Sequence, residues 1–167
     1  MRGELAVYLN EFEFRFGYPP DLNSVETGSG CDEAVRDEAS AVSAVSAVPA
    51  VSAAPGDLAL LYRHISRLSL PDVGVGLFVH SVRQTADGLR GDLPTRVVGE
   101  VEDSVAVFGS DGGGALFALS RTDGATVYRL PPARVDGSVY RCAEGIEVVA
   151  LGLRGFLVHV ESELRRS

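Results

Sequence analysis

The stretch FGSDGGGALFAL, residues 108–119, places an acid and three consecutive glycines directly before a run of apolar residues. Glycines can bind phosphate through their backbone N–H groups when they belong to a GxxxxGK[ST] loop or to a GxGxxG motif at the start of a helix. The chain has neither pattern, no lysine follows the glycines, and the next residues are typical of a strand. We therefore predict a tight connection between two strands at residues 110–114, in which glycine supplies positive φ angles.

The histidines are the next residues with catalytic potential. His64, His80 and His159 are isolated from one another in the sequence, and the motifs GxSxG, HExxH and CxxC are absent. This pattern favours ordinary structural or surface histidines. A hydrolase that uses His80 or His159 is the least favoured of the functions we consider.

Neighbouring carboxylates could act as a general acid and base, and Glu102 and Asp103, with Glu100 nearby, are the clearest case. Glu100 and Glu102 alternate with the valines around them, as residues on the solvated face of a strand and its turn do. Solvent exposure is therefore the favoured interpretation of these acids.

A metal site is not indicated by the remaining residues. Asp111 lacks the acids at alternate positions and the closing glutamate of a calcium-binding loop. Cys31 and Cys142 are far apart and show no metal-like spacing, so we expect buried or free thiols, with a disulfide as the alternative. We expect no cofactor and no metal.

Composition limits the classes of partner. The chain has 167 residues, of which 46% are hydrophobic, enough for the core of one domain. Its formal net charge is −8, and all 15 of its basic residues are arginine. An acidic surface disfavours direct binding of nucleic acid, because phosphates require clustered positive charge. It favours a basic partner, or serves only solubility.

The expected location is the cytoplasm. The N-terminus has acids from Glu4 onward and lacks the basic region and uninterrupted apolar core of a signal peptide. No segment supplies the roughly 18 apolar residues that span a membrane.

The first third of the chain predicts two helices separated by an insertion. Leu5, Tyr8, Leu9, Phe12 and Phe16 lie at helical spacing, although Phe12, Phe14 and Phe16 also alternate as in a strand. A second apolar stripe from Leu58 to Leu68 predicts a helix that ends before Pro71. Between them, residues 23–56 contain an acidic stretch, for which a short helix at 32–39 is an option, and a low-complexity Ser-Ala-Val repeat. We expect this insertion to be flexible.

From Gly76 onward the pattern is that of strands. The predicted strands are residues 77–82, 95–101, 104–109, 115–120, 125–130 and 138–143. Asp123-Gly124 is a strong hairpin signal between two of them. Apolar residues from Val148 to Leu164 then indicate a helix over 146–166. The whole chain is therefore predicted to be one α+β domain, residues 1–167.

The glycine-rich region resembles the SUKH superfamily of immunity proteins and cell-wall regulators. That family is marked by an aromatic-Gly-x-x-Gly-Gly-Gly turn, then an apolar strand and a strand with a Val-Tyr pair. The matching residues are Phe108, Gly109, Asp111, Gly112, Gly113, Gly114, Phe117, Val127 and Tyr128. YPPDL (18–22), LYRHI (61–65) and GFLVHVESEL (155–164) resemble other family segments, whereas PDVGVG (71–76) replaces the expected Asn-Gly-Gly turn.

The resemblance implies a curved antiparallel sheet flanked by N-terminal and C-terminal helices, and a binding protein rather than an enzyme. It also implies an immunity protein that neutralises a cognate toxin, often a nuclease or deaminase. An acidic surface suits a basic toxin domain, because carboxylates can occupy its phosphate-binding surface. The candidate partner-binding residues are Glu100, Glu102, Asp103, Asp111 and Asp123.

The alternative hypothesis is an intracellular regulatory or scaffold adaptor, in which the acidic N-terminal part and the Ser-Ala-Val repeat form a flexible arm. Deletion of residues 23–56 separates the two functions, because it abolishes binding by an adaptor arm and leaves toxin binding largely intact.

Overall fold

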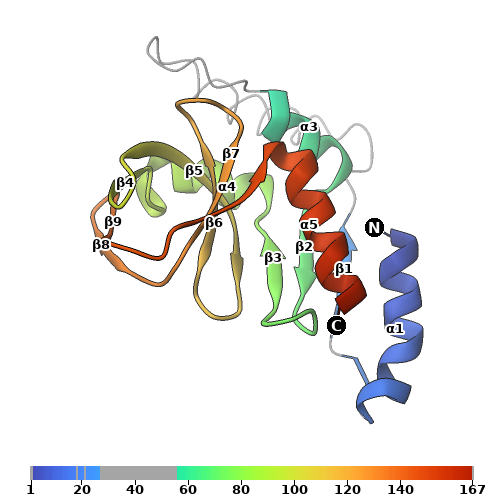
Figure 1. Cartoon of the computed structure of the whole chain (residues 1–167). Helices are drawn as coiled ribbons and strands as arrows, with labels where there is room; N and C mark the ends of the chain where they lie inside the picture. Colours follow the sequence, from blue (N-terminus) through green and yellow to red (C-terminus); the bar gives the residue numbers. More distant parts are fainter. Residues whose placement is uncertain (1, 18, 21, 27–55, 167) are drawn as a thin grey trace.

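The computed structural model describes residues 2–17, 19–20, 22–26 and 56–166. These residues form a strongly curved sheet with helices packed against it (Figure 1), which confirms the α+β class. The helices are α1 (Arg2–Phe16), α3 (Gly56–His64), α4 (Val82–Asp87), the π-helical turn η1 (Gly88–Asp92) and α5 (Gly152–Arg166). The strands are β1 (Ser24–Glu26), β2 (Arg67–Leu70), β3 (Leu77–Val79), β4 (Arg96–Gly99), β5 (Asp103–Asp111), β6 (Leu116–Ser120), β7 (Thr126–Leu130), β8 (Arg134–Asp136), β9 (Val139–Cys142) and β10 (Glu147–Leu151).

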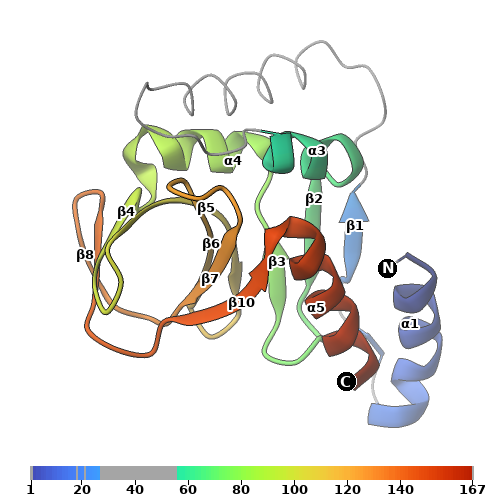
Figure 2. The same ribbon diagram turned by 45° about the horizontal axis from the view of Figure 1, so that its top comes forward.

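The long strand β5 organises the ten-stranded sheet. One of its edges pairs with β6, which continues to β7 and β10. Its other edge is divided: residues 109–111 pair with β3, and residues 103–104 pair with β4. The sheet therefore has one branch through β3, β2 and β1, and another through β4, β9 and β8 (Figure 2).

The predicted antiparallel arrangement needs one correction. β4 and β9 run parallel, with Arg96 opposite Val139 and Gly99 opposite Cys142. All other described strand pairs are antiparallel. The parallel pair arises because β8 and β9 form a hairpin that returns to β4 after the chain has left β7.

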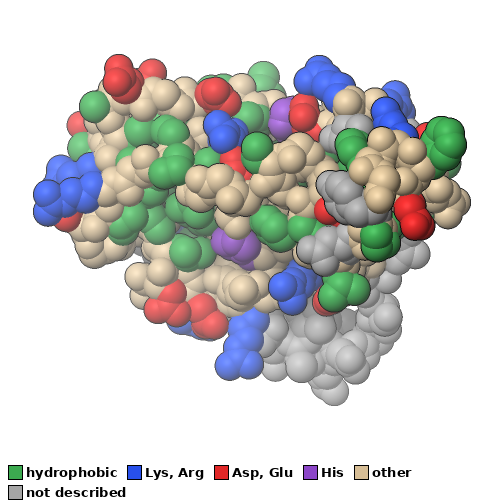
Figure 3. Space-filling view, turned by 90° about the horizontal axis from the view of Figure 1, so that it is seen from below, with side chains coloured by type: hydrophobic (Ala, Val, Ile, Leu, Met, Phe, Trp, Pro, Cys, Tyr) green, Lys and Arg blue, Asp and Glu red, His purple; other side chains and the backbone are tan. Residues whose placement is uncertain are grey.

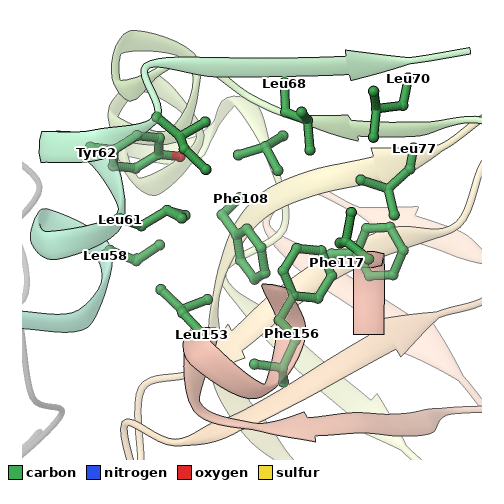
Figure 4. Packing of buried hydrophobic residues seen from close by; sticks show 14 of the residues in the cluster. Leu58, Leu61, Tyr62, Leu68, Leu70, Leu77, Phe108, Phe117, Leu153 and Phe156 are labelled. Carbon is green, nitrogen blue, oxygen red and sulfur yellow. The ribbon is translucent and has the colours of Figure 1, made fainter. Parts of the chain in front are cut away.

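The larger hydrophobic core lies between the sheet and the helices. Phe156 of α5 lies with its ring centre 5.1 Å from those of Phe108 and Phe117, and all three side chains are buried (Figure 4). Tyr62 of α3 joins the same core, where its hydroxyl forms a 2.6 Å hydrogen bond with the hydroxyl of Thr85. Each such aromatic or aliphatic side chain contributes about 1.5–3 kcal/mol by burial.

A smaller core lies on the opposite face of the same strands, inside the curl of the sheet. Its buried members are Val97, Val105, Val107, Ala118, Tyr128, Leu130, Tyr140 and Cys142. Because side chains alternate along a strand, Val105 and Val107 face this core while Ala106 and Phe108 face the helices. Burial on both faces explains why residues 105–108 are an uninterrupted apolar run.

Several predicted boundaries are wrong. The helix predicted over Leu58–Leu68 ends at His64, and Leu68 lies in β2. The strand predicted over 77–82 ends at Val79, because Ser81 forms a capping box with Gln84 and starts α4. The helix predicted over 146–166 begins only at Gly152, and the residues before it form β10.

The helix predicted near the N-terminus is confirmed as α1. The predicted insertion is described only at its ends, where residues 24–26 form β1 and Gly56 begins α3. The option of a helix at 32–39 falls outside the described residues.

Candidate functional site

The glycine-rich motif forms a closed turn between β5 and β6. Its N–H groups donate to internal acceptors: Gly112 to Gly76 O (3.2 Å), Gly113 to Asp111 Oδ1 (2.9 Å), Gly114 to Asp111 O (3.3 Å) and Ala115 to Asp111 Oδ1 (2.8 Å). An anion cradle needs such N–H groups to point outward to the ligand. The predicted turn is therefore confirmed, and its amides are not available to a phosphate.

Glycine is required at three positions of this motif for different reasons. A Cβ at Gly109 would lie 2.6 Å from Phe78 O, and one at Gly112 would lie 2.1 Å from Val75 O. Gly114 has a φ of 86°, a backbone region in which residues with a Cβ are strained. The motif thus lets the turn approach the β2–β3 connection closely.

Asp111 has an internal role. Its side chain is buried, and its Oδ2 accepts hydrogen bonds from Arg129 Nε (3.1 Å) and Nη2 (2.7 Å). Burial alone would raise the pKa of Asp111, but Arg129 and the N–H groups of Ala115 and Gly113 together lower it. A partner at the surface gains little access to this carboxylate, so the candidate binding set loses Asp111.

Tyr128 and Asp103 connect the smaller core to the surface. The hydroxyl of Tyr128 donates to Asp103 Oδ2 at 3.1 Å, and Thr122 donates to Asp103 Oδ1. Burial, followed by the Asp103 hydrogen bond, raises the pKa of Tyr128 to about 12. These contacts hold the start of β5 against the β6–β7 turn.

Asp123 shapes that β6–β7 turn and stays exposed. Its Oδ1 accepts the N–H groups of Ala125 (2.8 Å) and Thr126 (2.9 Å), and its Oδ2 accepts the Thr126 hydroxyl (2.5 Å). The Thr126 hydroxyl, then these N–H groups, lower the pKa of Asp123 to about 2. Asp123 therefore carries a full negative charge at neutral pH.

Glu100 and Glu102 lie in the connection from β4 to β5. Both side chains are exposed, as predicted. Glu100 Oε2 accepts the N–H of Ile146 at 2.8 Å, while Glu102 lies 3.7 Å from the guanidinium of Arg96. An exposed ion pair of this length contributes at most about 1 kcal/mol.

Glu102, Asp103 and Asp123 thus lie together, where β5 begins and β6 turns into β7. Glu100 lies apart from them, beside the start of β10. We call Glu102, Asp103 and Asp123 the acidic end. Arg96 and Arg121 also lie there, Arg121 through its N–H bond to Ser104 O. The acids outnumber these cations, so the potential of the acidic end is negative.

Exposed apolar side chains next to the acidic end were missed by the sequence analysis. Val148 and Leu151 of β10 are 60% and 75% exposed. They lie opposite Tyr128 and Thr126 of β7, the residues bonded to Asp103 and Asp123. The sequence analysis assigned both residues to a helix by their spacing, so they were not considered as candidate binding residues.

Other exposed apolar side chains are distributed over the described surface, and the face in Figure 3 shows them between charged groups. The large ones besides Val148 and Leu151 are Val7, Phe14, Phe16, Leu22, Leu60, Val75, Val135 and Val158. Single exposed residues of this kind are common, so the pair on β10 is distinguished by its position beside the acids.

His80 is held in the sheet rather than aimed into a reaction site. Its Nε2 lies 3.3 Å from Ser110 Oγ, and its buried Nδ1 has no hydrogen-bond partner among the described groups. Burial, then the charge of Arg67, lowers the pKa of His80. Burying an unprotonated ring nitrogen without a partner costs less than burying an unpaired N–H. This favours the tautomer in which Nε2 carries the proton and donates it to Ser110. A general base toward Ser110 would need the opposite tautomer.

His64 is exposed at the end of α3, and His159 is half-buried in α5 with its ring centre 6.5 Å from that of Phe156. In the described part of the chain, no three His, Cys, Asp or Glu side chains are grouped to hold a metal ion. Cys142 is buried with a free thiol, while Cys31 lies outside the described residues.

Searches of known proteins add no relative: the chain matches no family model, no curated protein and no solved structure. Within the described ranges, none of the helices combines the length and the apolar character needed to cross a membrane.

Proposed function

We propose that the chain is a non-enzymatic cytoplasmic binding protein that neutralises a toxin, and that its partner is a basic domain such as a nuclease or deaminase. The resemblance of the glycine-rich motif to the SUKH superfamily motivates the immunity role. The observation that carries the proposal is the acidic end, where Glu102, Asp103 and Asp123 are grouped beside exposed apolar side chains.

The physical basis is competition for a cationic surface. Enzymes that hold nucleic acid present arginine and lysine to phosphates. A negative surface increases the rate of encounter with such a domain and excludes its substrate once bound. Two of the acids are held in place by internal hydrogen bonds, Asp103 by Tyr128 and Asp123 by its own turn, so little side-chain entropy is lost on binding.

The first experiment is co-purification of the tagged protein from its own cells, followed by expression of each recovered basic protein alone and together with this chain. The proposal requires that one recovered protein arrests growth alone and that co-expression restores growth. If no recovered protein is toxic, or if co-expression restores nothing, the immunity role is wrong.

The electrostatic part is tested with the same pair of proteins. Glu102→Arg is expected to weaken the complex about tenfold or more, mainly through slower association, and to reduce its salt dependence. Glu11→Arg is the matched control, because it makes the same change of charge at an exposed position on α1, at the other end of the molecule (Figure 1). Equal losses in the two variants would mean that net charge alone matters, not the acidic end.

A further inference from the structure

β10 is an edge strand with an unoccupied side. It pairs with β7 from Glu147 to Leu151, and no second strand of the described residues pairs with it. The outward N–H and C=O groups of an edge strand are a template for another strand. Proteins commonly protect such edges with charged side chains. β10 carries one, Glu147, at its start, and then presents the exposed Val148 and Leu151.

An irregularity in β10 places these two side chains on one face. The register shifts between Val148 and Ala150, so that Val148 lies opposite Tyr128, and Leu151 opposite Thr126. Residues 126 and 128 are two apart in β7 and therefore share a face. Residues paired across strands also share a face, which puts Val148 and Leu151 side by side.

The acidic end borders the same face. Tyr128, opposite Val148, donates to Asp103, and Thr126, opposite Leu151, donates to Asp123. Directly before β10, the N–H of Ile146 donates to Glu100. An apolar pair thus has carboxylates along its border, the usual arrangement of an interface with an apolar centre and a charged rim.

We propose that β10 is the docking edge for an extended basic segment of the partner, which adds to the sheet as a further strand. Apolar residues at alternate positions of that segment cover Val148 and Leu151, and flanking arginines or lysines reach the acidic end. The main-chain hydrogen bonds supply affinity, and the apolar contacts and charges supply specificity. This proposal rests on the proposed function, since it names the chemistry of the surface through which the partner is held.

The probe is the synthetic peptide RRVTVTVRR, with two N-methylated forms that block either the valine or the threonine N–H groups. An added strand donates to β10 from one alternate set only. We therefore expect one N-methylated peptide to lose binding and the other to bind like the parent. Hydrogen exchange of the full chain is expected to slow at amides of residues 148–151 when the parent peptide is bound.

Side-chain substitutions test the face. Val148→Ser and Leu151→Ser are each expected to weaken peptide binding about three- to tenfold, because each removes apolar contact area. Val7→Ser, at a valine on α1 with a comparable 57% exposure, is expected to change nothing. Both residues of β10 are exposed, so circular dichroism of the variants should match that of the parent chain.

Unchanged binding of both N-methylated peptides, or slowed exchange only outside β10, overturns the edge-docking proposal. That result is distinguishable from failure of the proposed function, which is decided by growth rescue. Growth rescue gives a second test, with a toxin that the parent chain neutralises. If Leu151→Ser restores growth as well as the parent chain does, β10 is not in the interface, and the immunity role still stands.

Discussion

At the scale of single residues, Asp111 and Asp123 have the same structural task in two successive turns. Each carboxylate accepts N–H groups from residues two to four positions later in the chain. Aspartate does this readily in turns, because its short side chain reaches the neighbouring backbone. They differ in exposure, since Asp111 is buried against Arg129 while Asp123 remains at the surface.

Asp123 gives a pH dependence of stability. Its pKa in the folded protein is about 2, below the ordinary value of 3.8, so the unfolded chain takes up a proton more readily. The stabilisation is therefore complete above about pH 4 and is lost as the pH falls toward 2. Urea unfolding of the parent and of Asp123→Ala should show a difference that shrinks over this range. A difference that is constant from pH 7 to pH 2 would contradict the assignment.

The glycines of the β5–β6 turn should not be equally sensitive to substitution. Gly112→Ala places a Cβ 2.1 Å from the backbone oxygen of Val75, so we expect a loss of at least about 2 kcal/mol in the free energy of unfolding. Gly113→Ala, whose Cβ meets only the side chain of Asp111 at 3.3 Å, is expected to lose less than about 1 kcal/mol. Chemical denaturation measures both, and equal losses would refute the close-approach explanation.

At the scale of elements, the sequence predicted most of the sheet. β4, β5, β6, β7 and β9 fall within one or two residues of their predicted bounds because alternation and turn residues are strong signals. The Asp123-Gly124 hairpin is confirmed by the pairing of β6 with β7. β8 was not predicted, because its three residues carry too short a pattern.

The errors lie where a helix and a strand adjoin. Val148 and Leu151 match the apolar spacing of α5, yet Gly152 has a φ of 80°, which breaks the helix before it reaches them. Leu68 likewise continues the stripe of α3 but faces the same core from β2. The helix and the strand beside it face the same core, so apolar spacing alone does not show where one ends and the other begins.

Gly152 supplies a test of this boundary. In the structure, Gly152→Ala forces alanine into a left-handed backbone, and we expect a loss of about 1–2 kcal/mol in the free energy of unfolding. A continuous helix over residues 146–166 would instead gain about 1 kcal/mol from the same change. Gly3→Ala in α1, with nothing within 4 Å of its Cβ, is the control and should gain stability. Thermal unfolding gives the sign of each change.

The candidate site was predictable in part, because the strands next to it were predictable. The five acids were expected around the glycine-rich turn, but Asp103 and Asp123 lie at the other end of β5. That Glu100, Glu102, Asp103 and Asp123 adjoin strand ends was foreseen, because the sequence defines those strands well. The burial of Asp111 was not, because Arg129 lies 18 positions away and no local pattern connects the two. Val148 and Leu151 were missed with the element that carries them.

At the scale of the whole molecule, both cores depend on β5, β6 and β7, since these strands bury one face in each. The prediction of one domain over residues 1–167 then requires one unfolding transition. Val105→Ala in the smaller core and Leu70→Ala in the larger should each lower the midpoint of this transition. The expected losses in the free energy of unfolding are about 2 and about 3 kcal/mol respectively. Tyrosine fluorescence and far-UV circular dichroism should give superimposable curves for both variants. Separate transitions would show that the two cores unfold independently.

The parallel pairing of β4 with β9 has a consequence for synthesis on the ribosome. β4 gains this neighbour only after residues 139–142 have left the exit tunnel, and the larger core waits for α5, which comes later still. Hairpins β5–β6 and β6–β7 can pair early, but the face of the smaller core and the part of the larger core that α5 covers stay open to water until then. The nascent chain therefore exposes apolar surface of β5, β6 and β7 until β9 and α5 have emerged. Chaperones that bind apolar segments should associate more with chains halted before residue 139 than with chains halted after α5 has emerged.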